Sequence, residues 1–249
     1  MVLFRIVCHN AFWFQGYPFR DEIPPDPDTG VLDSLCRIYR SIEPDVICLQ
    51  EVQGRHAFEM ICGRLGMSGS YCPGSELTQY GGAMLWHNGR GDAVSDSSSS
   101  GAEVQRVFQI AEFTGPDIQL RICNIHLPSQ RQLGPRLAAE RRIRDLVEAV
   151  KLEPDLVVGD FNEPPGRSVG KRLERMGFVD SAGVLGHGNV STSLGGGRGD
   201  FIWVREELSG CLREYGVIGK KELDSRGSMY RYLSDHLPLW ISLSEGCRT

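Results

Sequence analysis

Short apolar runs bounded by glycine, proline or polar residues recur along the chain and predict β-strands. The runs cover residues 4–8, 46–50, 80–86, 104–113, 118–127, 156–158, 201–204, 210–217 and 237–243. Brief stretches rich in Val, Ile, Leu and Cys between turn residues are typical of buried strands. In the run 104–113 apolar and polar residues alternate, which predicts a strand that is exposed on one face.

Amphipathic segments separate these runs and predict helices over residues 29–41, 54–65, 137–152 and 168–176. Residues 87–102 hold a Gly-Arg-Gly-Asp sequence and four consecutive serines, which predict a solvated hairpin loop. Helices lie between strands in both halves of the chain. We therefore expect an α/β domain with two sheets and outer helices.

No change of composition divides the chain, and no repeat recurs at a fixed period. We therefore predict a single domain over residues 1–249, long enough to bury a sizeable core. The formal net charge of −5 and the pI of about 5.7 argue against a module that binds nucleic acid or anionic membranes non-specifically. They do not exclude an enzyme that meets phosphate locally, because a metal ion supplies its own positive charge.

Eight cysteines are spread along the chain without a CxxC pair or a metal-type cluster. Cys8, Cys48 and Cys123 lie inside apolar runs and are best explained as small buried hydrophobes. The N-terminus turns polar too soon for a signal peptide, and no apolar run is long enough to span a membrane. We therefore expect a reduced, cytoplasmic protein without a disulfide framework.

A polar residue or pair stands at the ends of most predicted core strands. The set comprises Asn10, Glu51, His126, Asp160 with Asn162, Asp200, and Asp235 with His236. Each residue alone has an ordinary explanation as a turn former, a helix N-terminal charge, a buried histidine or a strand cap. One site at a common sheet edge explains them together better than separate coincidences do.

This set suits a particular chemistry, because it offers hard oxygen ligands, few histidines and no cysteine. Such a donor set fits Mg²⁺ or Mn²⁺ rather than structural zinc. Glu51 can touch a divalent cation, Asp200 can orient His236, and the amides can bind phosphate oxygens. Together they indicate hydrolytic phosphoryl transfer, whose transition state needs charge neutralisation and an oriented water.

The same segments resemble the ordered motifs of the endonuclease/exonuclease/phosphatase superfamily, the DNase I-like metal-dependent phosphoesterases. The matching pieces are Cys-His-Asn10, Leu-Gln-Glu51-Val, Asn-Ile-His126-Leu, Gly-Asp160-Phe-Asn162, Gly-Asp200-Phe-Ile and Ser-Asp235-His236-Leu-Pro-Leu. They extend over almost the whole chain. The resemblance implies a four-layer α/β sandwich in which two mixed β-sheets pack face to face with helices outside, and the site lies at the top of the sandwich.

The resemblance also implies roles for the reacting groups. His236 pairs with Asp200 and either activates water or holds the phosphate. Asp160 positions or deprotonates the attacking water, and the roles of Asp160 and His236 can be exchanged in such sites. Asn162 holds a phosphate oxygen, and His126 stabilises the charge of the transition state.

By the same resemblance Glu51 is the main ligand of Mg²⁺, with Mn²⁺ as an alternative, and Asn10 and Asp235 assist it. This chain departs from the family pattern in two places. Asn10 is followed by Ala-Phe-Trp-Phe rather than a small polar turn, and a long glycine run precedes Asp200, where many nuclease members place an Arg one or two residues ahead; here Arg198 is two ahead. These departures concern the substrate rather than the chemistry.

The leading prediction is a hydrolase that cleaves a phosphodiester, with DNA or RNA as the substrate class. In the aromatic segment after Asn10 we predict that Trp13 and Tyr17 contact the substrate, whereas Phe12 and Phe14 pack on the core. Several cations follow the strand ends and form either a basic rim at the site or an ordinary solvated face: Arg131, Arg136, Arg167, Lys171, Arg172 and Arg175. We expect a monomer without an obligate protein partner.

Two alternatives remain open at this point. A phosphatase or phosphodiesterase of small molecules or lipid head groups fits the acidic pI and the aromatic segment. Salt separates it from a nuclease, because nucleic-acid binding weakens steeply as salt rises. The second alternative is a catalytically silent interaction module on the same fold, against which the intact set of site residues argues.

Overall fold

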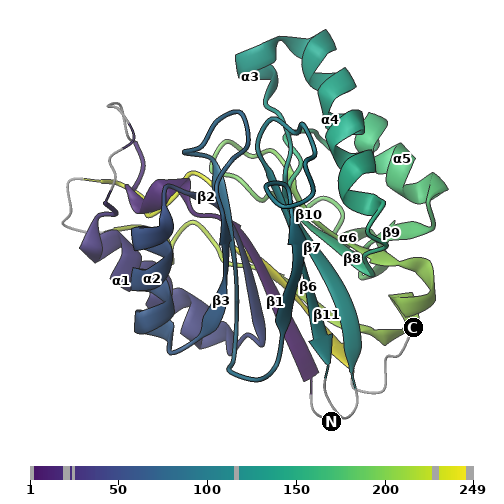
Figure 1. The fold of residues 1–249 in the computed structure, drawn as a ribbon. Coiled ribbons are helices and arrows are strands. Elements are labelled where there is room, and N and C mark those ends of the chain that lie inside the picture. The colour runs from purple at the N-terminus through teal and green to yellow at the C-terminus, as the bar shows by residue number, and fades with distance from the viewer. Residues whose placement is uncertain (1–2, 19–22, 24–25, 115–117, 226–229, 245–249) are drawn as a thin grey trace.

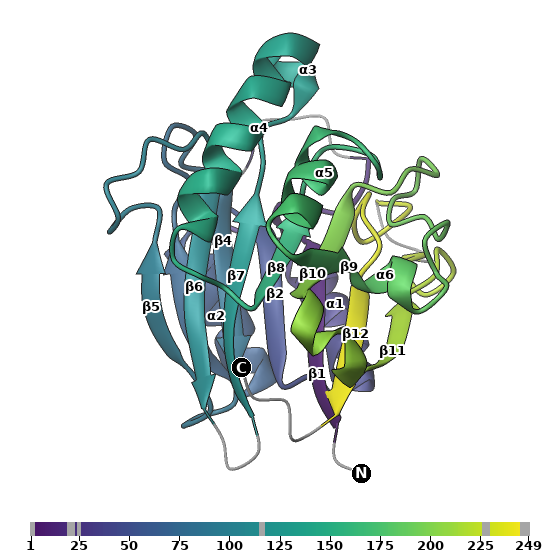
Figure 2. The same cartoon turned by 90° about the vertical axis from the view of Figure 1, so that its right-hand side faces the viewer.

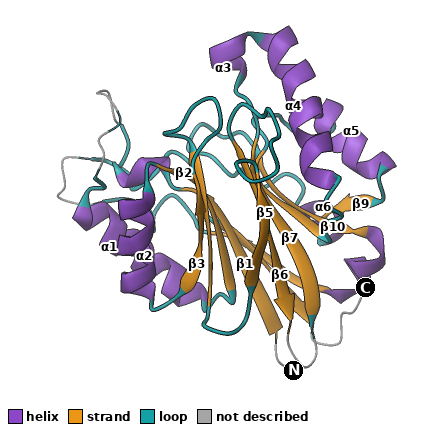
Figure 3. Ribbon diagram, in the orientation of Figure 1, coloured by secondary structure: helices purple, strands orange, loops and turns teal. Residues whose placement is uncertain are grey.

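The computed structural model describes residues 3–18, 23, 26–114, 118–225 and 230–244. Within these residues two six-stranded mixed sheets pack face to face, and helices cover their outer faces (Figures 1 and 3). This is the predicted four-layer α/β sandwich, and the fold class is confirmed.

The first sheet has the order β11-β12-β1-β2-β4-β3. Its strands are β1 (Leu3–Asn10), β2 (Val46–Val52), β3 (Ser68–Cys72), β4 (Gly81–Trp86), β11 (Leu212–Val217) and β12 (Leu239–Ser244). Only β1 and β2 are parallel neighbours, and every other pair in this sheet is antiparallel.

The second sheet has the order β5-β6-β7-β8-β10-β9. Its strands are β5 (Asp92–Asp96), β6 (Val107–Thr114), β7 (Gln119–His126), β8 (Leu156–Asp160), β9 (Phe178–Asp180) and β10 (Asp200–Arg205). Here β7 and β8 are the parallel pair at the centre. Gly159 of β8 lies opposite Ile125 of β7, and a Cβ at Gly159 would meet the Ile125 carbonyl oxygen at 1.8 Å, so only glycine fits.

Helices α1 (Thr29–Ile42) and α2 (Arg55–Leu65) cover the first sheet, whereas α4 (Pro135–Val150) and α5 (Ser168–Arg175) cover the second (Figure 2). The Asp28 carboxylate caps α1 by accepting from Val31 N at 2.9 Å. The short elements are η1 (Phe12–Phe14), α3 (Gln130–Leu133), α6 (Ser181–Val184) and η2 (Glu206–Cys211). Helix α3 projects beyond the edge of the sandwich (Figure 1).

Alternate residues of the central strands enter different layers of the core. In β1, Ile6 and Cys8 face the layer between the sheets, whereas Val7 packs under α1 and α2. This follows from the two-residue period of a strand that is covered on both faces. Cys8, Cys48 and Cys123 are fully buried in these layers, as predicted.

The structure corrects three predictions about the strands. Residues 87–102 are not only loop, because β5 lies within them and pairs with β6. Strand β6 is buried along most of its length, because Phe108 and Ile110 lie under α4 while Gln109 points between the sheets. The short strands β3 and β9 were not predicted, since β3 has few apolar residues and β9 spans only three residues.

Six cysteines are free among the described residues, but Cys211 is disulfide-bonded. The expectation of a fully reduced chain is therefore wrong at Cys211, and Cys247 lies outside the described residues. Within the ranges that the structure describes, no helix combines the length and apolar content needed to cross a bilayer.

Candidate active site

The predicted polar residues gather at one edge of the two sheets. Strands β1, β2, β7 and β8 end there, and β10 begins there because it runs antiparallel to β8. Asp160 at the end of β8 lies opposite His126 on one side and Asp200 on the other. A cleft of about 560 Å³ opens over this edge and is lined by Glu51, Asp160, Asn162, Asp200, Asp235 and His236.

Asp160 stands at the centre of the hydrogen bonds under this cleft. Its Oδ2 accepts from Asn10 Nδ2 at 3.1 Å and lies 3.3 Å from His126 Nε2. Its Oδ1 accepts from the backbone N of Asn162 at 2.8 Å. Asn10 and His126 are themselves buried, so Asp160 joins groups from β1 and β7 to the floor of the cleft.

His236 and Asp200 form a second unit beside Asp160. His236 Nδ1 lies 3.0 Å from both carboxylate oxygens of Asp200, and Thr192 Oγ1 donates to Asp200 Oδ2 at 2.7 Å. The other ring nitrogen, Nε2, faces the cleft, 3.9 Å from Asp160 Oδ2 and 4.0 Å from Asp235 Oδ1. The ring is thus held from behind and presents one nitrogen to a substrate.

The charges of this unit reinforce one another. Burial lowers the pKa of His236, but the charge and hydrogen bond of Asp200 and the charge of Asp160 outweigh burial, and the pKa rises well above its usual value. Burial raises the pKa of Asp160, but the hydrogen bond with His126 and the charge of His236 hold it below its usual range. Both shifts favour the charged pair, an imidazolium at His236 beside a carboxylate at Asp160.

Glu51 occupies a strained position at a bulge of β2. Its φ is +55°, in the left-handed region, and the pairing of β2 with β4 shifts between Gln50 and Val52. Burial raises the pKa of Glu51 to about 7, although the charge of Arg106 opposes this rise. Strained residues with perturbed carboxylates cluster at functional sites, which favours a ligand role here.

Two sets of side chains could take part in cation binding: the cluster of Asp160, Asp200 and His236, and the pair Glu51 and Asp235. Asp160, Asp200 and His236 each offer one ligand atom, and these atoms lie within 4.8 Å of one another. Asp200 is already engaged by His236 and Thr192. Asp235 Oδ1, in contrast, is buried and accepts no hydrogen bond from the described residues. Glu51 and Asp235 are therefore better candidates for cation ligands than Asp200, whose oxygens are already hydrogen-bonded. Their hard carboxylate oxygens suit Mg²⁺.

His126 and Asn162 lie together behind Asp160. Asn162 Nδ2 donates to the Leu127 carbonyl at 3.0 Å and lies 3.3 Å from His126 Nε2. Burial, followed by the charge of Arg106, lowers the pKa of His126 to about 4. His126 is therefore neutral at pH 7, and the positive charge beside it belongs to Arg106.

Arg106 and Tyr80 belong to this site, although the sequence analysis did not select them. The Arg106 guanidinium contacts His126 Nε2, donates to Gln132 Oε1 at 3.0 Å and lies 3.9 Å from Glu51 Oε1. Its Cζ is 4.2 Å from the centre of the Tyr80 ring. Both residues immediately precede strands, β6 and β4, that begin at the edge where β7 and β2 end. The sequence signal for both residues was their position one residue before a strand that pairs antiparallel with a strand ending at the site.

The aromatic segment forms one wall of the cleft. Phe12, Trp13 and Tyr17 all line it, so the prediction that Phe12 packs on the core is wrong, whereas Phe14 is fully buried. Trp13 is also largely buried, and its Nε1 donates to the Gln79 carbonyl at 2.7 Å. Of these rings, Tyr17 is the most exposed, with 38% of its surface open.

The predicted cations lie mostly elsewhere. Of the set that follows the strand ends, only Arg131 lines the cleft. Arg198 borders the cleft through part of its surface, but its guanidinium pairs with Asp180 and lies 4.5 Å from the centre of the Phe201 ring. Arg198 therefore anchors the glycine-rich segment instead of reaching a substrate phosphate.

An α/β sandwich that carries carboxylates, amides and a histidine–aspartate pair at one sheet edge has the architecture of a hydrolytic phosphoesterase. The model of the Endonuclease/Exonuclease/phosphatase family matches residues 9–236, and the chain belongs to this family. No curated protein matches the sequence.

Solved structures share the fold at low sequence identity. Human Nocturnin, as a catalytic domain with bound sulfate, is 19% identical with a TM-score of 0.68, over 98% of this chain and 93% of that one. D. rerio TDP2 with a single-strand DNA product is 17% identical with a TM-score of 0.69, over 97% and 99% of the two chains. A mannosyl-6-phosphatase of Bacteroides thetaiotaomicron is 15% identical with a TM-score of 0.69, over 97% and 99%.

The buried His9 makes folding stability depend on pH. Its Nδ1 lies 2.7 Å from the Tyr39 hydroxyl, and burial lowers its pKa to about 3. The unfolded chain binds a proton near pH 6.5, so the folded state holds fewer protons below that value and loses stability as pH falls. We expect the metal-free protein to lose about 2 kcal/mol from His9 between about pH 7 and pH 5, and about as much again from His126.

Urea unfolding in EDTA across this pH range measures the effect. The variant His9→Asn keeps a side-chain amide for Tyr39 but cannot titrate, so its stability should fall less steeply with acid than that of the wild type. Equal pH slopes for the two proteins would contradict the assignment of the neutral state to His9.

Proposed function

We propose that the protein is a divalent-metal-dependent hydrolase that cleaves a phosphodiester in nucleic acid. The observation that carries this proposal is the position of His236 Nε2. It faces the cleft between Asp160 Oδ2 and Asp235 Oδ1, at 3.9 and 4.0 Å, while Asp200 holds the opposite side of the ring. A fixed imidazolium among carboxylates suits hydrolysis of a phosphate ester, in which water replaces the leaving oxygen on phosphorus.

The side chains divide the chemistry between them. Asp160 orients the attacking water and accepts its proton as the new bond to phosphorus forms. The bond from phosphorus to the leaving oxygen breaks, and that oxygen takes a proton from solvent. His236 donates a hydrogen bond to a phosphate oxygen, and Asn162 Nδ2 binds a second oxygen with the one hydrogen that it does not donate to the Leu127 carbonyl. Arg106 supplies positive charge at buried His126, so these two residues stabilise the transition state together.

A cation site beside these groups completes the proposed centre. Glu51, Asp235 and Asn10 would hold Mg²⁺, or Mn²⁺ in its place, and the bound cation neutralises charge that develops on the phosphate. Asp235 Oδ1 lies 4.0 Å from His236 Nε2 but accepts no hydrogen bond from the described residues. This oxygen and the buried Glu51 carboxylate support the placement. EDTA should stop the reaction, and added Mg²⁺ should restore it.

Nucleic acid is favoured as the substrate because the lining of the cleft combines aromatic rings with an exposed cation. Arg131 is exposed on α3 and has no ion-pair partner in the part of the chain that the structure describes. The related TDP2 was solved with a single-strand DNA product, which agrees with this substrate class. Cytoplasmic localisation and a monomeric state remain predictions.

A phosphatase of small phosphate esters is the second candidate. The cleft of about 560 Å³ falls in the size range of small-molecule sites, and a relative with the same fold is a mannosyl-6-phosphatase. A substrate panel separates the candidates: single-stranded and duplex DNA, RNA, bis(p-nitrophenyl) phosphate, sugar phosphates, inositol phosphates and sphingomyelin. Turnover of phosphomonoesters alone would overturn the nuclease proposal, and no turnover of any substrate would favour a silent module.

Replacing Arg131 by alanine should weaken binding of single-stranded nucleic acid and reduce its dependence on salt. One lost phosphate contact lowers the slope of log K against log salt by about 0.7 for a single strand. Fluorescence anisotropy of a labelled oligonucleotide at several salt concentrations measures this slope. The variant Lys171→Ala on α5 is the control, because Lys171 is exposed but does not line the cleft. Equal slopes for the two variants would show that Arg131 does not bind phosphate.

A further inference from the structure

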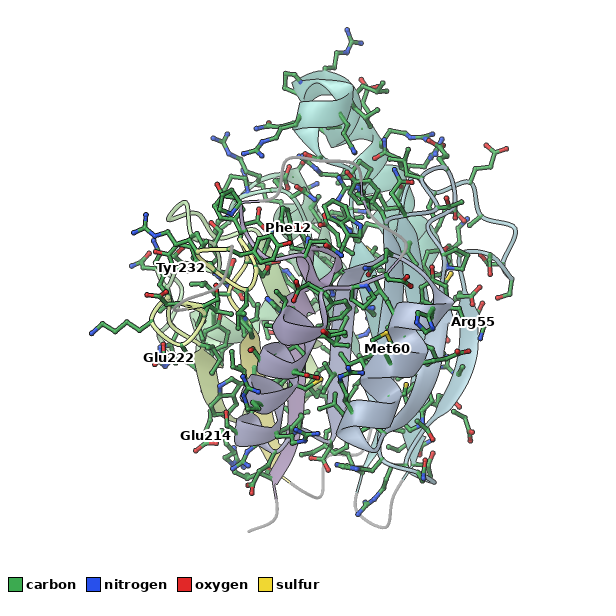
Figure 4. The ribbon with its side chains drawn as sticks, turned by 90° about the vertical axis from the view of Figure 1, so that its left-hand side faces the viewer. Phe12, Arg55, Met60, Glu214, Glu222 and Tyr232 are labelled. Carbon is green, nitrogen blue, oxygen red and sulfur yellow. The ribbon has the colours of Figure 1, made fainter. Side chains whose placement is uncertain are left out.

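The aromatic wall of the cleft is a continuous series of rings that leads from the rim to the catalytic groups. Tyr17 and Phe12 meet edge to face with their centres 5.9 Å apart, and Phe12 lies 5.3 Å from Trp13. Trp13 lies 5.1 Å from Tyr80, whose ring is 5.9 Å from that of His126. Figure 4 shows Phe12 at the same end of the molecule as Tyr232, whose backbone pairs with that of Tyr17.

The backbone that carries these rings is strained and tightly held. Three consecutive residues, Phe12, Trp13 and Phe14, have φ values of +48°, +50° and +53°. Non-glycine residues in this region persist only where the surroundings enforce them. Phe12 N donates to Asn10 Oδ1 at 3.1 Å, and Gln53 Nε2 donates to the Trp13 carbonyl at 2.7 Å. The rings are therefore positioned before a substrate arrives. The hydrogen bond from Phe12 N links them to Asn10, a residue of the proposed cation site.

The position of Tyr17 within this wall suits a flat ligand. Its backbone N donates to the Tyr232 carbonyl at 2.7 Å, and its carbonyl accepts from Arg231 N and Tyr232 N at 3.0 Å. The main chain is thus fixed independently of the side chain, whose ring lines the cleft and is 38% exposed. An aromatic ring at the mouth of a phosphate site can stack a nucleobase, since every base offers a flat π-face.

The remaining surface argues against a lipid and against a duplex. The other large apolar side chains that are exposed among the described residues, Val94, Leu137, Val184 and Val190, do not line the cleft. Among the described residues, none of these four exposed side chains therefore extends the cleft into a membrane-binding face. Arg131 is the only cation of the α3–α5 set at the cleft. The other arginines that line it, Arg106 and Arg198, are buried and held by His126 and Asp180, so the described residues offer no extended track for two phosphate backbones.

On the basis of the function proposed above, we propose that the substrate is single-stranded nucleic acid with an unpaired base stacked on Tyr17 and supported by Phe12. The adjoining phosphate lies over Asp160 and His236, and the next phosphate along the strand pairs with Arg131 in the lining of the cleft. Tyr17 then selects for the presence of a base, whereas Arg131 recognises the backbone only.

Two oligomers of equal length test this assignment. One is a labelled oligothymidylate, and the other has the same phosphodiester backbone with abasic tetrahydrofuran units. Binding is measured by fluorescence anisotropy in a Glu51→Gln background, which prevents hydrolysis during the measurement. Tyr17→Ala should weaken binding of the thymidylate by about 10- to 100-fold and leave the abasic oligomer unchanged. Tyr17→Phe should retain wild-type binding, and Arg131→Ala should weaken both oligomers equally.

Each other outcome is decisive. Equal affinity of the starting protein for the two oligomers, equal weakening of both by Tyr17→Ala, or binding of neither would overturn the stacking proposal. So would binding to phosphatidylcholine vesicles in place of the thymidylate. Hydrolysis of both oligomers at the same rate by the wild type would preserve the proposed function and overturn the stacking. Base-dependent binding through Tyr17 without hydrolysis would support the stacking and overturn the proposed function.

Discussion

Replacing Glu51 by glutamine should abolish metal-dependent turnover without destabilising the metal-free protein. Glutamine keeps the shape of the side chain but removes the charge that the cation needs, so kcat/KM should fall about 10³-fold or more. Burial already raises the pKa of Glu51 to about 7, which means that its charged form opposes folding at higher pH. The metal-free variant should therefore unfold at the same temperature as the wild type or above it.

Two measurements check this expectation together. Steady-state hydrolysis of bis(p-nitrophenyl) phosphate or single-stranded DNA reports turnover, and thermal unfolding with and without Mg²⁺ reports cation binding. Mg²⁺ should raise the unfolding temperature of the wild type but not that of Glu51→Gln. Glu174→Gln is the matched control, since Glu174 is exposed on α5 and does not line the cleft. Wild-type turnover in Glu51→Gln would sink the assignment of the cation site.

Replacing His236 by alanine should lower kcat/KM about 10³- to 10⁴-fold. The substitution removes the nitrogen that faces the cleft between Asp160 and Asp235. Positioned proton donors and charged hydrogen bonds to a developing oxyanion contribute effects of this size. His56→Ala is the control, because His56 on α2 is exposed and contacts only Asp26 among the ion pairs of the described residues. Retained activity in His236→Ala would contradict the proposed mechanism.

A substitution of Asp200, the partner of His236, tests the charge of the histidine separately. Asp200 raises the pKa of His236, so Asp200→Asn should lower that pKa while it preserves the side-chain volume. The limb of the pH–rate profile that reports loss of the His236 proton should then move to lower pH. An unchanged profile would show that Asp200 positions the ring without controlling its charge.

Much of the fold could be predicted because its signals are local. The strands that form the centre of each sheet are apolar enough to be recognised from their own residues, as β8 shows with Leu156, Val157 and Val158. Strands β5 and β9 could not be recognised in this way. Strand β5 is mostly polar and β9 is only three residues long, so neither gives a strand pattern of its own. Each is a strand because it pairs with β6 or β10, and that pairing is not a property of the segment itself.

The candidate site divides along the same line. Residues that end parallel strands, such as Asn10 and Asp160, were accessible to sequence reasoning because a polar residue after an apolar run is visible in the chain. Arg106 and Tyr80 stand before their strands, so their relevance depends on which strands run antiparallel to β7 and β2. The role of Arg198 also depends on tertiary structure, since its position near Asp200 in the sequence does not reveal its ion pair with Asp180.

By itself, the sequence determined the class of fold, the family and the carboxylate, amide and histidine groups that meet at the sheet edge. The alternation of apolar and polar residues along a strand and the polar residue at its end are local features of the sequence. They do not depend on which strand lies beside it. Only the tertiary structure decided which charges face one another, which cation reaches the cleft, and which rings form its wall. Those features depend on strand order, direction and register, which are set by contacts between residues far apart in the chain.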